Sequence, residues 1–479
     1  MRIYPKIIQG GMGIAVSSWP LAAAVARRGQ MGVVSSSGLD LVLARRLQLG
    51  DIGGRLREAL DQFPIRSVAE RVLARYFIPG GKAPDAPFRS KPLPSIRPSQ
   101  AILELMVVAN FAEVFLAKQG HSGPIGINLL EKIQLPTLPS LYGAMLAGVD
   151  FVLMGAGIPR AIPEILDRLA RLERVELKLD VVGAQASEVF TTTFMPQEFG
   201  PPDIGSLKRP EFLAIVSSST LAATLAKKCT GRVDGFVVEG KTAGGHNAPP
   251  RGELTLDETG QPVYGPRDIP NLDQIRELGL PFWFAGSFGS PEKLRQALDL
   301  GAQGIQIGTA FAFCNESGIS PDIKARTIRR CIERRAEVFT DPQASPTGFP
   351  FKVLELEGTL SESLVYESRQ RVCDLGYLRE LYRKEDGTVG YRCSGEPIDD
   401  FVRKGGDPAK TAGRKCICNG LLASIDLGQV RNQGPEPALV TAGDDVSNLT
   451  RFLRSGQSSY SADDVVDFVL SGSTQELAP

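Results

Sequence analysis

Residues 281–309 read PFWFAGSFGSPEKLRQALDLGAQGIQIGT. The stretch begins with the apolar run Pro281–Ala285, passes through an amphipathic segment at Pro291–Leu300, and ends with a second apolar run at Gly304–Gly308. Runs that are apolar throughout indicate strands covered on both faces, which is typical of parallel sheets. The stretch therefore predicts a strand–helix–strand unit with a right-handed crossover.

The same alternation continues through most of the chain. Further apolar runs lie at Lys6–Gln9, Met31–Ser35, Ile125–Asn128, Val149–Met154, Glu176–Val182, Phe212–Ser217 and Gly235–Glu239. Helical patterns lie between them at Pro20–Arg28, Ala101–Lys118, Pro159–Glu173 and Thr220–Lys228. We predict an α/β fold, a TIM (β/α)8 barrel, because Gly-rich turns follow early, middle and late strands. An open doubly wound sheet is the alternative. The apolar runs number one more than the eight strands of a closed barrel, so one of them is misassigned or is an accessory strand.

Two regions break the alternation. Pro79–Ser99 holds six prolines and predicts an extended surface insertion near the barrel mouth. From about Phe339 the strand–helix rhythm ends. We therefore predict a barrel domain over residues 1–340 and a C-terminal extension over residues 341–479 that packs on it, with a last amphipathic helix at Ala462–Leu470.

The bulk composition limits the classes of partner and the compartment. The 54 basic and 54 acidic side chains cancel, which gives no electrostatic reason to expect nucleic acid or a membrane as partner. The segment Met1–Gly13 lacks a secretory signal pattern, and no run approaches the roughly 18 apolar residues that span a bilayer. The seven cysteines are odd in number and widely spread, so we expect free thiols and a cytoplasmic location.

Two late turns have the composition of a phosphate site. Gly286 and Ser287 follow the strand that ends at Ala285, and Gly308 and Thr309 follow the next one. Glycine lets the backbone approach an anion, and in (β/α)8 barrels the turns after the seventh and eighth strands commonly bind phosphate. The alternative is that these glycines only permit tight turns.

The segment 236–247 reads FVVEGKTAGGHN, a strand that ends in a Gly-Gly-His turn. The paired glycines would let a flat ring lie against the backbone, within reach of His246. Histidine is the usual residue for moving a proton near neutral pH. The chain has only one other histidine, His121, in a Gly-rich connection. His246 is therefore the candidate acid–base residue, and a turn-capping histidine is the alternative.

Five short motifs occur in a characteristic order. They are Gln9-Gly10-Gly11-Met12-Gly13, Gly126-Ile127-Asn128-Leu129, Ala243-Gly244-Gly245-His246, Ala285-Gly286 and Gln306-Ile307-Gly308-Thr309. In this order they resemble the nitronate monooxygenase family, formerly the 2-nitropropane dioxygenases, over roughly residues 3–330. The FMN-dependent enoyl reductases of fatty-acid and polyunsaturated-fatty-acid synthesis share the same framework.

The resemblance implies FMN bound non-covalently at the C-terminal mouth of the barrel. The cofactor-binding residues it implies are Gly11, Met12, Gly13, Asn128, Glu239, Gly244, Gly245, Gly286, Ser287, Gln306, Ile307, Gly308 and Thr309. It places His246 on the family's catalytic base, which removes a proton from a nitroalkane or steers a nitronate. The flavin then passes the electrons to dioxygen.

The chain departs from the family pattern in several places. It has Glu239 where many members have Gln, and Thr242 where many have Glu, while Asn247–Arg251 looks more like the enoyl reductases. Three functions therefore stay open: a nitronate monooxygenase, an FMN enoyl reductase that uses NAD(P)H, and a non-flavin barrel that binds another phosphorylated ligand. A homo-oligomer is compatible with each of them.

Four cysteines in the extension raise the question of a metal site. They are Cys373, Cys393, Cys416 and Cys418. Structural zinc sites usually have two cysteine pairs spaced two to four residues apart, whereas here the only close pair is separated by one residue. We interpret the four as ordinary thiols and predict no metal from the sequence.

Overall fold

The computed structural model of the chain describes residues 4–200 and 205–471, and a parallel eight-stranded sheet lies at its centre. The strands of this sheet are β1 (Ile7–Gln9), β2 (Gly32–Ser35), β3 (Ile125–Leu130), β4 (Phe151–Gly155), β8 (Glu211–Val216), β9 (Gly235–Glu239), β10 (Phe282–Ala285) and β11 (Gly304–Ile307). Their order is β1-β11-β10-β9-β8-β4-β3-β2, and a parallel bridge between Ile8 and Met31 joins the two ends. The predicted TIM barrel is confirmed, and the open-sheet alternative is wrong.

The supernumerary run, Glu176–Val182, is the accessory one. It forms β5 (Val175–Lys178) and β6 (Val181–Val182), which lie outside the barrel sheet. β5 pairs antiparallel with β7 (Thr191–Phe194). Along β5 buried and exposed residues alternate, so the strand has one solvated face, unlike the barrel strands.

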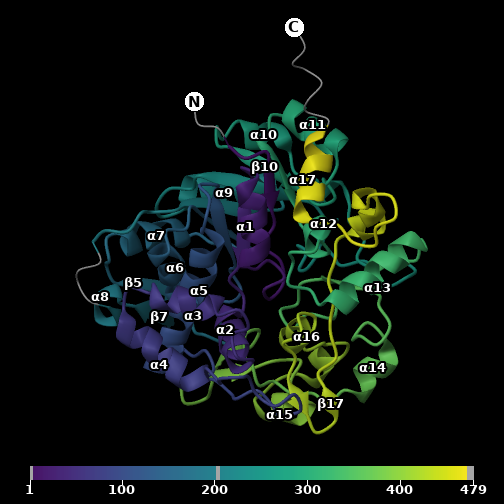
Figure 1. Cartoon of the computed structure of the whole chain (residues 1–479). Helices are drawn as coiled ribbons and strands as arrows, with labels where there is room; N and C mark the ends of the chain where they lie inside the picture. The colour runs from purple at the N-terminus through teal and green to yellow at the C-terminus, as the bar shows by residue number, and fades with distance from the viewer. Residues whose placement is uncertain (1–3, 201–204, 472–479) are drawn as a thin grey trace.

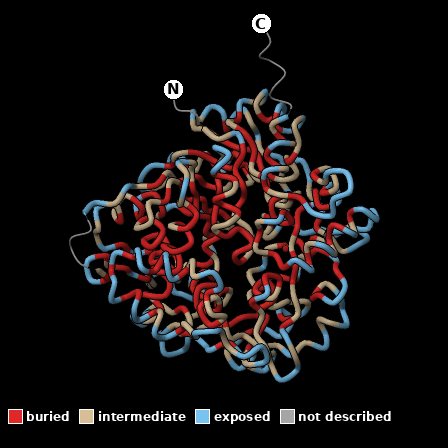
Figure 2. The backbone as a smooth tube through the Cα atoms, viewed as in Figure 1, coloured by how far each residue is buried: buried red, intermediate tan, exposed pale blue. Residues whose placement is uncertain are grey.

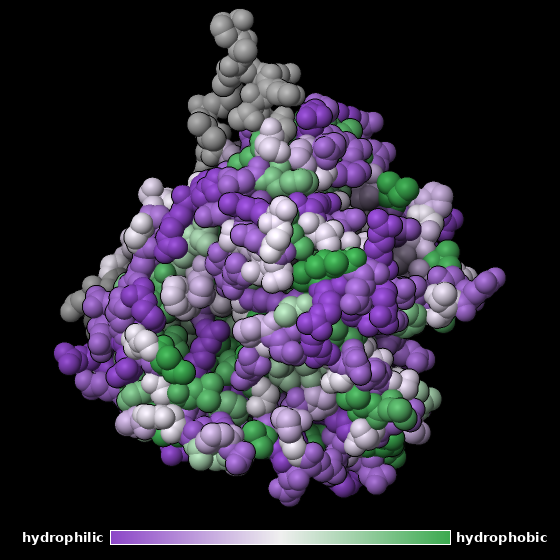
Figure 3. Space-filling model, turned by 45° about the vertical axis from the view of Figure 1, so that its right-hand side comes forward, coloured by the Kyte–Doolittle hydropathy of each residue, from purple (hydrophilic) through white to green (hydrophobic). Residues whose placement is uncertain are grey.

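The barrel interior is filled by side chains from alternate strand positions. They are Ile8, Met31, Val33, Phe151, Leu153, Leu213, Val237, Trp283 and Ala285. The fully buried Trp283 donates its indole N–H to the carbonyl oxygen of Pro5 at 2.9 Å. Figure 2 shows this buried centre surrounded by exposed loops, and the surface in Figure 3 mixes hydrophilic and hydrophobic residues, as folded domains normally do.

Helices cover the outside of the barrel. They are α1 (Trp19–Arg27), α2 (Leu39–Gln48), α3 (Arg55–Asp61), α4 (Arg66–Tyr76), α5 (Gln100–Ala117), α6 (Thr137–Leu146), α7 (Ile162–Ala170), α8 (Pro196–Phe199), α9 (Ser219–Lys228), α10 (Leu272–Arg276), α11 (Pro291–Asp299), α12 (Thr309–Ala312) and α13 (Pro321–Ile332), with a 3-10 turn η1 (Pro266–Asp268). The predicted helices are confirmed as α1, α5, α7, α9 and α11. By length and composition α5 is apolar enough to cross a membrane, but 78% of it is buried inside the protein.

The last part of the chain forms short elements. They are β12 (Val338–Asp341), β13 (Phe351–Leu354), α14 (Ser363–Ser368), β14 (Glu380–Arg383), β15 (Val389–Arg392), α15 (Ile398–Arg403), η2 (Pro408–Thr411), α16 (Ile417–Ala423), β16 (Val430–Arg431), β17 (Gly434–Pro435), η3 (Asp444–Phe452) and α17 (Ala462–Leu470). The predicted last helix is confirmed as α17, which lies beside α1 and α11 (Figure 1). Arg28, just after α1, pairs with Asp463 and Asp467 of α17.

The proline-rich insertion runs between the barrel helices and the last part of the chain. It contains no helix or strand within 79–98. The side chain of Gln429 accepts a hydrogen bond from the backbone N–H of Phe88 at 2.8 Å. The buried Lys91 pairs with Asp40 of α2 at 2.8 Å. The insertion is therefore fixed on both sides by specific contacts.

The division into a barrel and an extension at residue 340 stays a prediction.

Candidate active site

One pocket opens at the end of the barrel where the β-strands terminate, and it encloses about 220 Å³. The residues predicted from the sequence all line it: Gly11, Met12, Gly13, Asn128, Glu239, Gly244, Gly245, His246, Gly286, Ser287, Gln306, Ile307, Gly308 and Thr309. Turns that are up to about 300 residues apart in the chain therefore meet at one rim, as expected for a (β/α)8 barrel.

The turn after β1 lies tightly against the Asn128 side chain of β3. A Cβ atom added at Gly11 would lie 2.2 Å from the Cβ of Asn128, so only glycine fits there. The Asn128 amide donates to the carbonyl oxygen of Leu153 at 3.1 Å, which fixes the side chain. A Cβ at Gly308 would lie 3.5 Å from the Met12 sulfur, an ordinary contact. The backbone thus forms a close-packed wall at this side of the pocket.

The turn after β10 holds polar atoms without partners. Gly286 has φ +99° and Ser287 has φ +56°, which is an uncommon conformation for a residue with a side chain. Within the described part of the chain, the buried Ser287 hydroxyl and the buried Gln306 amide oxygen have no hydrogen-bond partner. Buried polar groups are normally paired, so these two atoms indicate a polar ligand that completes the site.

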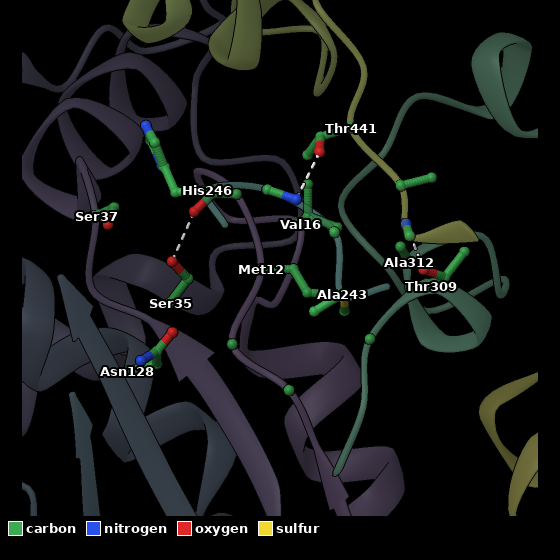
Figure 4. Close-up of a pocket in the computed structure, with 18 of the residues that line it drawn as sticks. Met12, Val16, Ser35, Ser37, Asn128, Ala243, His246, Thr309, Ala312 and Thr441 are labelled. Carbon is green, nitrogen blue, oxygen red and sulfur yellow. Dashed lines mark hydrogen bonds between the residues drawn. The ribbon is translucent and has the colours of Figure 1, made fainter. Parts of the chain in front are cut away.

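The last part of the chain closes the rim from above the glycine turns. The backbone N–H of Gly443 donates to the Thr309 hydroxyl at 2.8 Å, and the N–H of Gly245 donates to the Thr441 hydroxyl at 2.9 Å. Figure 4 shows Thr441 and Thr309 in these contacts at the side of the pocket. A Cβ at Gly244 would lie 2.8 Å from the backbone nitrogen of Gly443. Segment 440–445 and the Gly-Gly-His turn are therefore packed backbone to backbone.

His246 is held by groups from the last part of the chain. Its Nε2 atom lies 2.7 Å from the Ser345 hydroxyl, and its ring packs edge-on against Phe351 with centroids 4.8 Å apart. Figure 4 shows the imidazole at the pocket opposite Met12. Burial lowers the pKa of His246 to about 4. The imidazole is therefore neutral near pH 7 and able to accept a proton.

Glu239, at the end of β9, lies in the same pocket. Burial raises the pKa of its carboxyl to about 7. The environment thus favours the uncharged form of both Glu239 and His246. Such shifted pairs in a pocket are typical of acid–base sites.

The last part of the chain adds residues to the pocket that were not expected from the sequence. They are Phe351, Tyr377, Leu378, Ile417, Cys418, Leu421, Ser424, Val440, Thr441, Ala442, Gly443 and Asp445. The Tyr377 hydroxyl donates to Asp40, which also pairs with Lys91. These residues lie in short elements and loops without the regular strand–helix alternation of the barrel, so their spacing did not place them in the site.

The comparisons with known proteins agree with the motifs. Residues 122–342 match the family model for nitronate monooxygenase. The matched range includes Asn128, the Gly-Gly-His turn and the turns at Gly286 and Gly308, but not the turn at Gly11.

Curated relatives match a limited part of the chain. A Mycobacterium tuberculosis (3aS,4S,5R,7aS)-5-hydroxy-7a-methyl-1-oxo-octahydro-1H-indene-4-carboxyl-CoA dehydrogenase is 30% identical over 159 residues, 33% of this chain and 39% of the relative. A probable nitronate monooxygenase of Bacillus subtilis is 31% identical over 153 residues, 32% of this chain and 41% of the relative. The chain thus spans about two fifths of the length of these relatives.

Two solved structures cover nearly all of the chain at low identity. FabK from Thermotoga maritima has a TM-score of 0.48 at 15% identity, covering 98% of this chain and 93% of that one. Nitroalkane oxidase from Streptomyces ansochromogenes has a TM-score of 0.46 at 15% identity, covering 98% and 95%. The fold assignment rests on the closed sheet itself. The family model and the curated relatives confirm the resemblance inferred from the motifs, and residues 122–342 carry it.

Proposed function

We propose that this protein is an FMN-dependent oxidoreductase that oxidises alkyl nitronates or nitroalkanes with dioxygen. The observation that carries the proposal is the convergence of the Gly244–His246 turn with the turns at Gly286 and Gly308 in one pocket. The match of residues 122–342 to the family model for nitronate monooxygenase, an oxidoreductase family, supports the proposal.

The pocket fits FMN. In this proposal Gly11, Met12 and Gly13 flank the ring, Asn128 bonds the ring or the ribityl chain, Glu239, Gly244 and Gly245 contact the cofactor, and Gly286, Ser287, Gln306, Ile307, Gly308 and Thr309 hold the phosphate end. The unpartnered Ser287 hydroxyl and Gln306 oxygen would find partners there. When bound, FMN would take electrons from the substrate and pass them to dioxygen.

His246 is the proposed base. Its neutral imidazole would accept a proton from the carbon that carries the nitro group, while Ser345 orients the ring. Burial lowers the pKa of His246 to about 4, so the imidazole is neutral near pH 7 and free to accept a proton.

Replacing His246 with asparagine tests this role. We expect FMN to stay bound, and turnover of neutral nitroalkanes to fall by up to about 10²–10⁴-fold if His246 transfers the proton. Turnover of the matching nitronates should fall less, because they need no deprotonation. An equal loss on both substrates, or no loss on either, would contradict the role of His246 as base.

An FMN enoyl reductase that uses NAD(P)H is the second candidate. Two observations favour it: the Asn247–Arg251 segment resembles enoyl reductases, and one curated relative is named a dehydrogenase of a carboxyl-CoA compound. Anaerobic reduction of the flavoprotein separates the two. Bleaching by a nitronate alone supports the monooxygenase, and rapid bleaching by NADPH without a nitronate supports the reductase.

A barrel that binds a different phosphorylated ligand is the third reading. A colourless preparation that takes up no FMN would support it over both flavoenzymes. A small-molecule substrate, a homo-oligomer, a cytoplasmic location and the lack of nucleic-acid or membrane partners stay predictions from the sequence.

A further inference from the structure

The loop that follows β12 carries two hydroxyl groups next to His246. The Ser345 hydroxyl lies 2.7 Å from Nε2 of His246 and 2.8 Å from the Thr347 hydroxyl. Ser345 is fully buried, whereas Thr347 is half-buried and is followed by the exposed Gly348. The two hydroxyls therefore form a short chain that leads from the imidazole toward the protein surface.

Residues 345–348 read SPTG and fold as a tight turn that holds this chain in place. The backbone N–H of Gly348 donates to the Ser345 carbonyl oxygen at 3.1 Å, and Pro346 stands at the position where such turns favour proline. The backbone N–H of Thr347 donates to the Ser345 hydroxyl at 3.2 Å. Arg414 donates to the Ser345 carbonyl oxygen at 2.5 Å. The turn is thus held by its own backbone and by a neighbouring arginine.

The Gly-Gly-His turn is joined to the same part of the chain. His246 and Phe351 form an antiparallel bridge. Two backbone hydrogen bonds flank it, one donated by Lys352 at 3.0 Å and one donated by Asn247 at 2.9 Å. The imidazole consequently meets Ser345 although 99 positions of the sequence separate the two residues.

The count of donors and acceptors gives the hydroxyl chain a direction. A hydroxyl group has one hydrogen and can accept two hydrogen bonds. The Thr347 N–H takes one acceptor position of the Ser345 oxygen. When Nε2 of His246 donates to the second position, the Ser345 hydrogen points to the Thr347 oxygen. Nδ1 of His246 then keeps the lone pair that a base needs.

A small cavity begins where the hydroxyl chain ends. It encloses about 10 Å³, about the size that holds one water molecule, and Thr347, His246 and Lys132 are among its lining residues. The Lys132 side chain is 38% exposed, and its ammonium group lies 3.8 Å from the Asp180 carboxylate. The cavity therefore adjoins a residue that reaches solvent.

We propose that Ser345 and Thr347 form a proton relay for His246. Nδ1 of His246 takes the proton from the substrate carbon, and the electron pair of that C–H bond stays on the carbon. Nε2 passes its own proton to the Ser345 oxygen, the Ser345 hydrogen moves to the Thr347 oxygen, and the Thr347 hydrogen leaves to water. The proton on Nδ1 is later released into the pocket and one returns along the chain, which restores the starting tautomer. This inference rests on the proposed function, in which His246 is the base.

A relay suits a buried imidazole. Burial lowers the pKa of His246 to about 4, so the charged imidazolium is disfavoured in the site. A ring that takes a proton at one nitrogen while it releases one at the other does not have to hold that charge. Proton transfer along a chain of hydroxyls or waters is one form of general acid–base catalysis.

The first test is NMR spectroscopy of the whole chain with ¹⁵N-labelled histidine. The chain has only two histidines, so His121→Asn assigns the signals of His246. We expect the neutral ring to carry its hydrogen on Nε2, and we expect Ser345→Ala to lose this preference. A wild-type ring with its hydrogen on Nδ1 overturns the relay, whether or not the protein oxidises nitronates.

Substitutions at Thr347 distinguish a relay from a hydroxyl that only orients the ring, because Ser345 stands between Thr347 and the imidazole. Thr347→Val keeps a similar volume but removes the hydroxyl. It should lower kcat on neutral nitroalkanes by up to about 10²-fold, with KM little changed. Turnover of the matching nitronates should fall much less, since they need no deprotonation. Thr347→Ser keeps the hydroxyl and should restore most of the rate.

Ser361→Ala is the matched control. Ser361 forms a similar hydroxyl pair with Thr359 at 2.9 Å in another turn of the same part of the chain, and its loss should leave both rates at the wild-type level. Equal nitroalkane rates for Thr347→Val and Thr347→Ser, or equal losses on nitroalkanes and nitronates, overturn the relay. A wild-type protein that oxidises neither substrate refutes the proposed function, and the position of the His246 hydrogen then supports or overturns the directed hydroxyl chain by itself.

Discussion

Replacing His246 with asparagine should change how the stability of the protein depends on pH. Burial lowers the pKa of His246 from 6.5 to about 4 in the folded protein. Between these values the unfolded chain takes up a proton that the folded chain does not, so stability is lost as the pH falls from 6.5 to 4. The full loss is about 3 kcal/mol at 1.36 kcal/mol per pKa unit.

Glu239 acts in the opposite direction over nearly the same range. Burial raises the pKa of its carboxyl from 4.5 to about 7. The folded chain therefore holds a proton between these values that the unfolded chain has lost, and stability falls as the pH rises from 4.5 to 7, by about 3 kcal/mol in full. In the wild type the two effects nearly cancel, and each single variant reveals the other residue.

Urea unfolding at about pH 7 and about pH 4.5 measures both effects. From the higher to the lower pH, the free energy of unfolding of His246→Asn relative to wild type should rise by about 2 kcal/mol. That of Glu239→Gln relative to wild type should fall by a similar amount. His121→Asn, which leaves both pocket residues in place, is the matched control and should follow the wild type. If the free energies of unfolding of the wild type and of His246→Asn change by the same amount between these two pH values, the reasoning is refuted.

Three further substitutions test the geometry of the pocket. Gly244→Ala places a Cβ 2.8 Å from the Gly443 backbone nitrogen and should lower the free energy of unfolding by about 1–3 kcal/mol, seen as a lower melting temperature and weaker FMN binding. Gly240→Ala is the control and should behave like the wild type, because the nearest atom to its Cβ lies at 3.7 Å. Equal behaviour of the two variants would contradict a close-packed rim. Ser287→Ala removes a hydroxyl expected to bond phosphate and should raise the FMN dissociation constant roughly 10- to 150-fold in a fluorescence titration, since such a bond is worth about 1.5–3 kcal/mol; an unchanged constant places the phosphate elsewhere. Tyr460→Phe removes the 2.7 Å hydrogen bond to the Ala310 carbonyl and should lower stability by about 1 kcal/mol in urea unfolding without changing FMN affinity; a loss of affinity would show that this contact shapes the pocket.

The barrel could be predicted from the sequence because its strands are buried on both faces. Runs such as Phe282–Ala285 and Gly304–Ile307 are apolar throughout, and helices with one apolar stripe separate them. The run at Glu176–Val182 differs from them, because charged and apolar residues alternate along its first part, which is the pattern of a strand with one solvated face. In the structure it forms two accessory strands, β5 and β6, which lie outside the barrel sheet and in different small sheets.

The barrel residues of the pocket were predictable for a related reason. Glycine turns follow the carboxyl ends of barrel strands, which all meet at one rim. The contribution of the last part of the chain was not predictable, because its elements are short and irregular and reach the rim through contacts such as the hydrogen bond from the Gly443 backbone N–H to the Thr309 hydroxyl. Ser345, which holds His246, was missed for a related reason, since the two residues are neighbours in space but lie far apart in the chain.

Equilibrium titration of the flavin-stripped protein with FMN shows whether the glycine turns and His246 form one FMN site. We predict that one FMN binds per chain and that Ser287→Ala weakens binding while Gly240→Ala does not. A protein that binds no FMN, or that binds it equally well as wild type, Ser287→Ala and Gly240→Ala, would contradict this site.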